Sequence, residues 1–221
     1  KTINYYPTDV SDLSGLSSES NTAAASLLLK NRFEIIQKDV LKDTVLHSRL
    51  RTNYKNWDIN LILPKTIQTS KGSQSLEDRI VYHDYDDKGN PLEVSKKDGT
   101  KIYYVWGYNK TQPIAKIENF QSISTSQQTA ITNAISSSNS DSLLGTLSSE
   151  NTLRVKLQEL RDEFPNSMVT TFTYDPLIGV TSIADPRGKT VYYHYDSFNR
   201  LEFVKDNEGN ILSENKYNYK N

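Results

Sequence analysis

The sequence predicts a mainly β protein, in which antiparallel hairpins form a curled sheet with an inserted α-helical hairpin. A tyrosine-led unit recurs along the chain, tyrosines alternate with other residues in several segments, and one region between the copies carries apolar residues at helical spacing. A period of two is typical of strands, whereas spacings of three and four indicate an amphipathic helix. With 14 Tyr against 6 Phe and 2 Trp, we expect half-buried strands whose tyrosine hydroxyls contact water.

The recurring unit is a Tyr-Asp pair with an aliphatic residue nine positions after the Tyr and a Gly fourteen positions after it. The three copies are Tyr85, Val94 and Gly99; Tyr174, Ile183 and Gly188; and Tyr195, Val204 and Gly209. Tyr108-Asn109, with Ile117 nine residues on, is a candidate degenerate copy, and Tyr219 a candidate start of another. Because units of this kind bury a face only against their neighbours, tandem repetition predicts a stacked architecture.

The first segment, residues 1–56, precedes the repeats. Residues 1–25 are rich in Ser, Thr, Asn and Ala, which predicts an extended lead-in followed by a short helix at about 23–30. From 33 to 54, β-branched and apolar residues alternate with charges around Lys42-Asp43. This pattern predicts a hairpin that joins the same sheet.

The second segment, residues 57–120, is the first repeat block. Pro64 interrupts the strand predicted at 57–69, and because proline cannot donate to the ladder, this strand is expected to be an edge or bulged strand. Asp87-Lys88-Gly89-Asn90 then has the residues of a turn.

For the third segment, residues 121–165, the sequence predicts the helical hairpin. A first helix at about 126–135 is followed by a Ser-rich link, and a second helix begins with Ser149 as its cap and ends before Pro165. The second helix carries four apolar residues on one face: Leu153, Leu157, Leu160 and Phe164. We expect the hairpin to lie on the sheet or to cap an exposed sheet edge.

The fourth segment, residues 166–221, is the second repeat block. Along 191–195, alternate residues fall on opposite faces of a strand. Asp196-Ser197-Phe198-Asn199 supplies a turn in which Asn accepts positive φ, and 200–204 makes the return strand. The next turn, at 206–209, places Gly209 in a left-handed conformation.

These residues carry a resemblance to a known family. Tyr195-Asp196-Ser197-Phe198-Asn199-Arg200-Leu201, followed by Val204, Asp206 and Gly209, resembles the YD-repeat signature of RHS proteins, with Asn199 where the family usually has Gly. The stretches 104–115 and 174–180 are similar to segments near the C-terminus of very large bacterial RHS-repeat proteins. The resemblance covers roughly residues 60–120 and 165–221.

The resemblance implies a part of a large exported bacterial protein, secreted or at the cell surface. It implies surface display, adhesion, the wall of a shell around a toxin, or cargo of the type IX secretion system, with the rest of the parent polypeptide or a surface complex as partner. Two alternatives remain open: a glycan-binding or adhesion module that uses exposed Tyr and Trp, and the carrier part of a polymorphic toxin.

Composition excludes several other classes. Twenty-six Lys plus Arg against 27 Asp plus Glu give a net charge of -1, so we expect no nucleic-acid partner. No window approaches the roughly 18 apolar residues of a membrane-spanning helix. Cysteine is absent and the three His stand singly, so we expect no catalytic centre, no cofactor and no thiolate metal site.

Two sets of residues are candidates for ligand contact. Asp84, Asp86 and Asp87, followed by Gly89, have part of the spacing of a calcium loop, but a solvated turn of the repeat is the favoured role, because Lys88 lies inside the loop and no bidentate Glu follows. Tyr104, Trp106 and Tyr108 alternate along one strand and could stack on sugar rings, although cross-strand packing inside the sheet is the simpler role for such aromatics.

Overall fold

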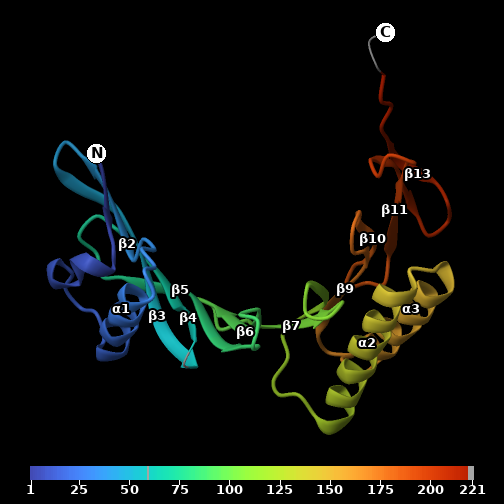
Figure 1. The fold of residues 1–221 in the computed structure, drawn as a ribbon, viewed down its shortest axis with the longest axis horizontal. Coiled ribbons are helices and arrows are strands. Elements are labelled where there is room, and N and C mark those ends of the chain that lie inside the picture. The colour runs from blue at the N-terminus through green and yellow to red at the C-terminus, as the bar shows by residue number, and fades with distance from the viewer. Residues whose placement is uncertain (59, 219–221) are drawn as a thin grey trace. The chain divides into compact units, whose positions relative to one another are not determined.

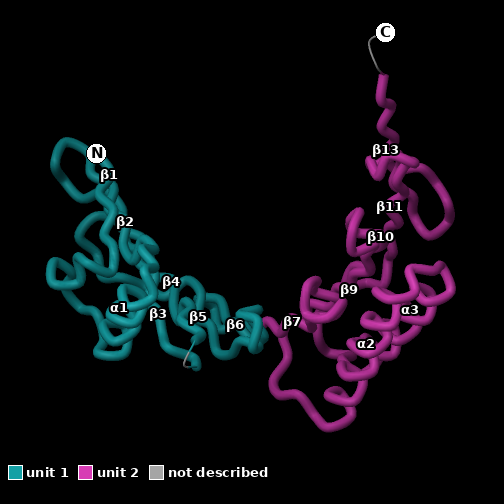
Figure 2. Tube along the Cα trace, in the orientation of Figure 1, with its two compact units in different colours: residues 1–101 teal, residues 102–221 magenta. Residues whose placement is uncertain are grey.

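The computed structural model describes residues 1–58 and 60–218 and is mainly β, with the strands in chain order from β1 to β13 (Figure 1). Each neighbouring pair within a unit is antiparallel. The predicted fold class, antiparallel hairpins in a curled sheet with an inserted helical hairpin, is confirmed. The chain divides into two compact units, residues 1–101 and 102–221 (Figure 2). As domain boundaries, the four segments expected from the sequence stay predictions.

The described residues of unit 1 form six strands, one 3-10 helix and one α-helix. Its elements are β1 (Thr2–Tyr5), η1 (Pro7–Asp12), α1 (Ser18–Leu29), β2 (Gln37–Lys42), β3 (Val45–Asp58), β4 (Leu61–Lys71), β5 (Glu77–Tyr85) and β6 (Pro91–Lys96). In its core, Ala23 and Leu27 of α1 are fully buried against Ile62 of β4 and partly buried Tyr54 of β3. Burial of these side chains holds the helix on the sheet.

Of three sequence predictions for unit 1, one needs correction and two are confirmed. The lead-in is not simply extended, because β1 pairs with β2 and α1 begins at Ser18, after Ser17 caps it by accepting a hydrogen bond from the amide of Ser20 at 3.1 Å. The β2–β3 hairpin is confirmed, with positive φ at Asp43 and Thr44 in its turn. The strand that contains Pro64 is bulged but is not an edge strand, since β4 lies between β3 and β5.

In the part of unit 2 that the structure describes there are seven strands and two long helices. Its elements are β7 (Lys101–Gly107), β8 (Gln112–Glu118), α2 (Thr125–Leu144), α3 (Leu147–Asp162), β9 (Met168–Asp175), β10 (Gly179–Ala184), β11 (Thr190–Tyr195), β12 (Leu201–Asp206) and β13 (Ile211–Glu214). α2 and α3 lie side by side (Figure 1) and pack on β7–β9. The four apolar residues predicted for one face of α3 and its end, Leu153, Leu157, Leu160 and Phe164, are all buried in this core.

The helical hairpin differs from its prediction in two respects and agrees with it in a third. α2 continues through the Ser-rich stretch to Leu144, because Ala134 and Ser138 are small enough to be buried on its inner face. The cap of α3 is Thr146, whose hydroxyl accepts from the amide of Ser149 at 3.1 Å. As one of the two predicted alternatives, the hairpin lies on a sheet face, and the strands before and after it, β8 and β9, pair with each other.

Candidate functional site

Four turns of the repeats share one hydrogen-bond pattern. One carboxylate oxygen of the leading Asp accepts from the backbone amides two and four residues later, at 2.8 to 3.0 Å. The leading residues are Asp86, Asp185, Asp196 and Asp206. Three residues after each stands a residue with positive φ, namely Gly89, Gly188, Asn199 and Gly209. The Asp of the repeat therefore builds the turn, and Asn199 adopts the conformation that Gly has in the other turns.

The other repeat-defining residues occupy equivalent places. Val94, Ile183 and Val204 each lie inside the return strand of a hairpin, paired with Tyr82, Phe172 and Tyr193 respectively. Gly99 has positive φ in the reversal that follows β6, as Gly188 and Gly209 have after β10 and β12. A recurring sequence position thus corresponds to a recurring backbone position.

The three repeat tyrosines, and also Tyr217, each donate the hydroxyl to a backbone carbonyl of the adjacent strand, directly before the extra residue of a β-bulge. We call this the tyrosine–bulge contact. The donor, acceptor and distance are Tyr85 to Pro64, 2.9 Å; Tyr174 to Pro113, 3.0 Å; Tyr195 to Val180, 2.9 Å; and Tyr217 to Leu201, 2.9 Å. The extra residues are Lys65, Ile114, Thr181 and Glu202. Because a bulge disrupts the ladder, the hydroxyl satisfies a carbonyl that would otherwise need another partner.

These contacts give each repeat tyrosine a carbonyl acceptor that the sequence did not predict, on side chains that are half-buried as expected. Burial raises the pKa of Tyr174 to about 12 and also raises the pKa of Tyr85 and Tyr195, so each hydroxyl keeps its proton and remains a donor. Tyr217 makes the same contact, whereas Tyr219, the residue predicted to start a further copy, lies outside the described residues. The degenerate copy at Tyr108 differs, because its hydroxyl donates to Asp141 of α2 at 3.0 Å.

Removal of one such hydroxyl is expected to weaken the fold measurably. Tyr174→Phe should lower the free energy of unfolding by about 1 kcal/mol, because the carbonyl of Pro113 loses its donor. Tyr192→Phe is the matched control, since the Tyr192 hydroxyl makes no hydrogen bond to any described residue, and its effect should stay below about 0.5 kcal/mol. Urea denaturation followed by circular dichroism measures both, and equal effects of the two changes would contradict a role for the contact.

The turn carboxylates predict a dependence of stability on acid. The pKa values of three turn aspartates lie below the ordinary 3.8, chiefly because of the backbone amide of Lys189 for Asp185, the guanidinium of Arg200 for Asp196 and the side-chain amide of Asn210 for Asp206. A carboxylate whose pKa is lower in the folded state contributes stability above the unfolded value of 3.8, and this contribution disappears as pH falls through the folded value.

We therefore expect the urea midpoint to fall between pH about 5 and pH about 2. The combined change of Asp185, Asp196 and Asp206 to Asn should make that fall shallower. Asp12→Asn, at an exposed aspartate outside these turns, should leave it unchanged. An unaltered pH profile in the triple variant would show that the turn carboxylates do not contribute.

The candidate calcium-binding residues take part in the hydrogen bonds of a turn. Asp86 accepts from two backbone amides through one oxygen and from the side chain of Asn90 through the other, and Asp84 accepts from the amide of Tyr85. In the described parts of the chain, no group of three or more His, Asp or Glu side chains is placed to hold a metal ion. Asp84, Asp86 and Asp87 are therefore not brought together as a set of ligands.

The three candidate glycan contacts differ in their burial. Tyr108 is 1% exposed beneath α2, so its ring is not available to a sugar, contrary to the prediction. Tyr104 and Trp106 are half-buried on β7, and glycan contact by these two residues stays a prediction.

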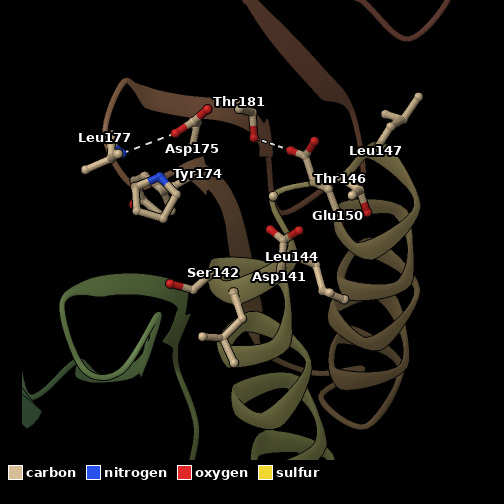
Figure 3. Close-up of a pocket in the computed structure, with 13 residues that line it drawn as sticks. Asp141, Ser142, Leu144, Thr146, Leu147, Glu150, Tyr174, Asp175, Leu177 and Thr181 are labelled. Atoms are coloured by element: carbon tan, nitrogen blue, oxygen red, sulfur yellow. Dashed lines mark hydrogen bonds between the residues drawn. The ribbon is translucent and has the colours of Figure 1, made fainter.

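A hollow of about 350 Å³ lies between the α2–α3 turn and the β9–β10 turn (Figure 3). Its lining contains three carboxylates, those of Asp141, Glu150 and Asp175, and no Lys, Arg or His. Four leucines at the same place are exposed to between 64% and 94%: Leu143, Leu144, Leu147 and Leu177. The hollow therefore combines an acidic lining with an apolar rim.

Asp141 lies in the wall of the hollow and is 4% exposed. It accepts from the hydroxyl of Tyr108 at 3.0 Å and from the hydroxyl of Ser149 at 2.6 Å. Tyr108 in turn accepts from the backbone amide of Tyr174 at 2.9 Å, and burial raises the pKa of its phenol. This chain of bonds connects the last turn of α2, the start of α3 and strand β9.

Glu150 is held differently, in a polar network on β9 and β10. One of its oxygens accepts from Arg154 at 2.8 Å and from Thr173 at 2.9 Å, and the same oxygen contacts Thr181. The ion pair with Arg154 compensates the charge of Glu150. By contrast, Asp141 and Asp175 form no ion pair with any described residue.

Sequence reasoning missed this hollow entirely. Its residues come from two turns that are separated in the chain by strand and helix, and a turn sequence does not show which other turn it will face. The sequence signal that could have indicated it is the run Leu143-Leu144-Gly145-Thr146-Leu147. Its leucines do not continue the spacing of the buried residues in either helix.

Comparisons with known proteins add no assignment. A scan against protein-family models found no model that matches the chain, and a search of curated proteins found no matching relative. Among the described helices, none is both long enough and apolar enough to cross a membrane.

Proposed function

We propose that this chain is a non-catalytic structural module of a large exported bacterial RHS-type protein, in which it forms part of a wall or displayed surface. The observation that supports this most is the recurrence of the tyrosine–bulge contact at four places along the chain. A contact that serves every repeat alike, with a turn built by the same Asp hydrogen bonds, belongs to a scaffold rather than to a single reactive centre.

Repeats of this kind form a sheet that can be extended by one hairpin at a time. Each hairpin places its tyrosine against the bulge of the strand before it, so each added unit is bonded to the preceding one by a ladder and by a side chain. Stability then comes from neighbours in series, which suits a protein that covers area. The secreted or surface location, and service as secretion cargo, rest on the resemblance of Tyr195–Gly209 to YD repeats.

The test is to locate and image the parent protein. Antibodies raised against residues 1–221 should detect it in the culture medium or on intact cells of its source, and protease added to those cells should remove the surface signal. Electron microscopy of the purified parent should place this module in a continuous sheet. A parent found only in the cytosol, or a module standing alone with no neighbouring repeats, would overturn the proposal.

A further inference from the structure

We propose that the hollow between the α2–α3 turn and the β9–β10 turn binds a lysine or arginine side chain that a partner protein presents between aliphatic residues. This inference goes beyond the proposed function, because it rests on the hollow alone and holds for any role of the sheet. The occupant is a peptide segment with a cationic side chain at its centre.

Charge is the first argument. Asp141 is a carboxylate with 4% exposure, and within the described residues its carboxylate accepts from two hydroxyls alone. Carboxylates buried to this extent are almost always paired with a cation, because desolvation of an uncompensated charge is costly. No ion pair to Asp141 exists within the described chain, and its side chain lines an opening to solvent. A cation that enters from outside would supply the missing pair.

A second carboxylate borders the same opening. Asp175 uses one oxygen to accept from the amide of Leu177 at 3.2 Å and has no ion-pair partner among the described residues. In Figure 3, Asp141 and Asp175 come from different segments, α2 and the end of β9, and border one space. Glu150 faces it too, although Arg154 already pairs with that carboxylate. The hollow thus offers two uncompensated negative charges to one ligand.

Apolar surface is the second argument. Single exposed leucines are ordinary on a protein surface, but a cluster around one opening marks an interaction site. Leu177 and Leu147 stand on opposite sides of the opening in Figure 3, with exposures of 94% and 72%. Lysine and arginine combine a charged head with an apolar stem, so their stems suit the leucine rim and their heads the acidic wall. A volume of about 350 Å³ accommodates one such side chain.

Short peptides of defined sequence provide the probe. Isotope-labelled chain 1–221 is titrated with acetyl-Leu-Lys-Leu-amide, with the Arg counterpart and with the Gln counterpart, and amide shifts are followed by NMR. The Lys and Arg peptides should move the signals of Gly145 and Leu177, while Leu29 on α1, 87% exposed but remote in sequence and in the other unit, should not move. The Gln peptide should bind about tenfold more weakly, because it lacks the charge.

Variants then assign the contribution of each feature. Asp141→Asn should weaken the Lys peptide about tenfold, and Asp175→Asn, at a turn where Asn also fits, should weaken it about threefold. If Asp141→Asn fails to fold, the proposal is tested with Asp175→Asn and Leu177→Ser instead. Leu29→Ser is the matched control for Leu177→Ser and should leave affinity unchanged.

Several outcomes would overturn the proposal. These are equal binding of the Lys and Gln peptides, shifts that fall outside the hollow, or unchanged affinity in both Asp175→Asn and Leu177→Ser. Concentration-dependent shifts of the same amides without peptide would also overturn it, because the occupant would then be a second copy of this chain.

Discussion

Replacement of Leu153 with alanine is expected to lower the free energy of unfolding of unit 2 by about 3 kcal/mol. Leu153 is 0% exposed and lies in the core between α3 and the sheet, where it belongs to the same cluster as Ile117 and Val169. The loss of stability has two parts. The removed methyl groups no longer contribute by leaving water on folding, and they leave a cavity that the neighbouring side chains on two strands fill only partly.

Val155→Ala provides the matched control for this prediction. Val155 is on the same helix but is 56% exposed, so its truncation should change stability by less than about 0.5 kcal/mol. Urea denaturation followed by far-ultraviolet circular dichroism reports on α2 and α3. A similar loss for both variants would contradict core packing as the cause, because alanine has a higher helix propensity than either residue it replaces.

Replacement of Gly107 with alanine is expected to cost about 3 kcal/mol through overpacking. An added Cβ at the end of β7 would clash with the side chain of Ser138 on α2 and would lie 2.7 Å from Cγ2 of Ile114. Ser138 cannot move away freely, because it is fully buried and its hydroxyl accepts from the amide of Tyr108 at 3.1 Å. The methyl group would therefore force α2 away from β7.

Gly99→Ala separates this effect from backbone strain. Gly99 has a φ of +83° and open space around an added Cβ, so its substitution should cost about 1 kcal/mol, from the left-handed backbone alone. Thermal or urea unfolding should rank Gly107→Ala well below Gly99→Ala in stability. The opposite order would show that α2 and β7 are less closely packed than the contact between Gly107 and Ser138 implies.

The sequence by itself determined the local features of this protein. Asp196 with Asn199, and Asp206 with Gly209, identify their turns. The carboxylate accepts from backbone amides two and four residues later, and a residue that tolerates positive φ stands between them, all within one short stretch of chain. The spacing of Leu153, Leu157 and Leu160 similarly identifies a buried helix face. These properties need no knowledge of what lies beside them.

Only the tertiary structure decided the remaining features, because each depends on a partner far away in the chain. Tyr174 finds the carbonyl of Pro113 across an insertion that contains both helices, and nothing in its own strand specifies that acceptor. Burial of Ser138 against Gly107 keeps α2 helical through a stretch that local propensity assigned to a link. The uncompensated charge of Asp141 likewise arises from packing, since the turn that buries it belongs to another part of the sheet.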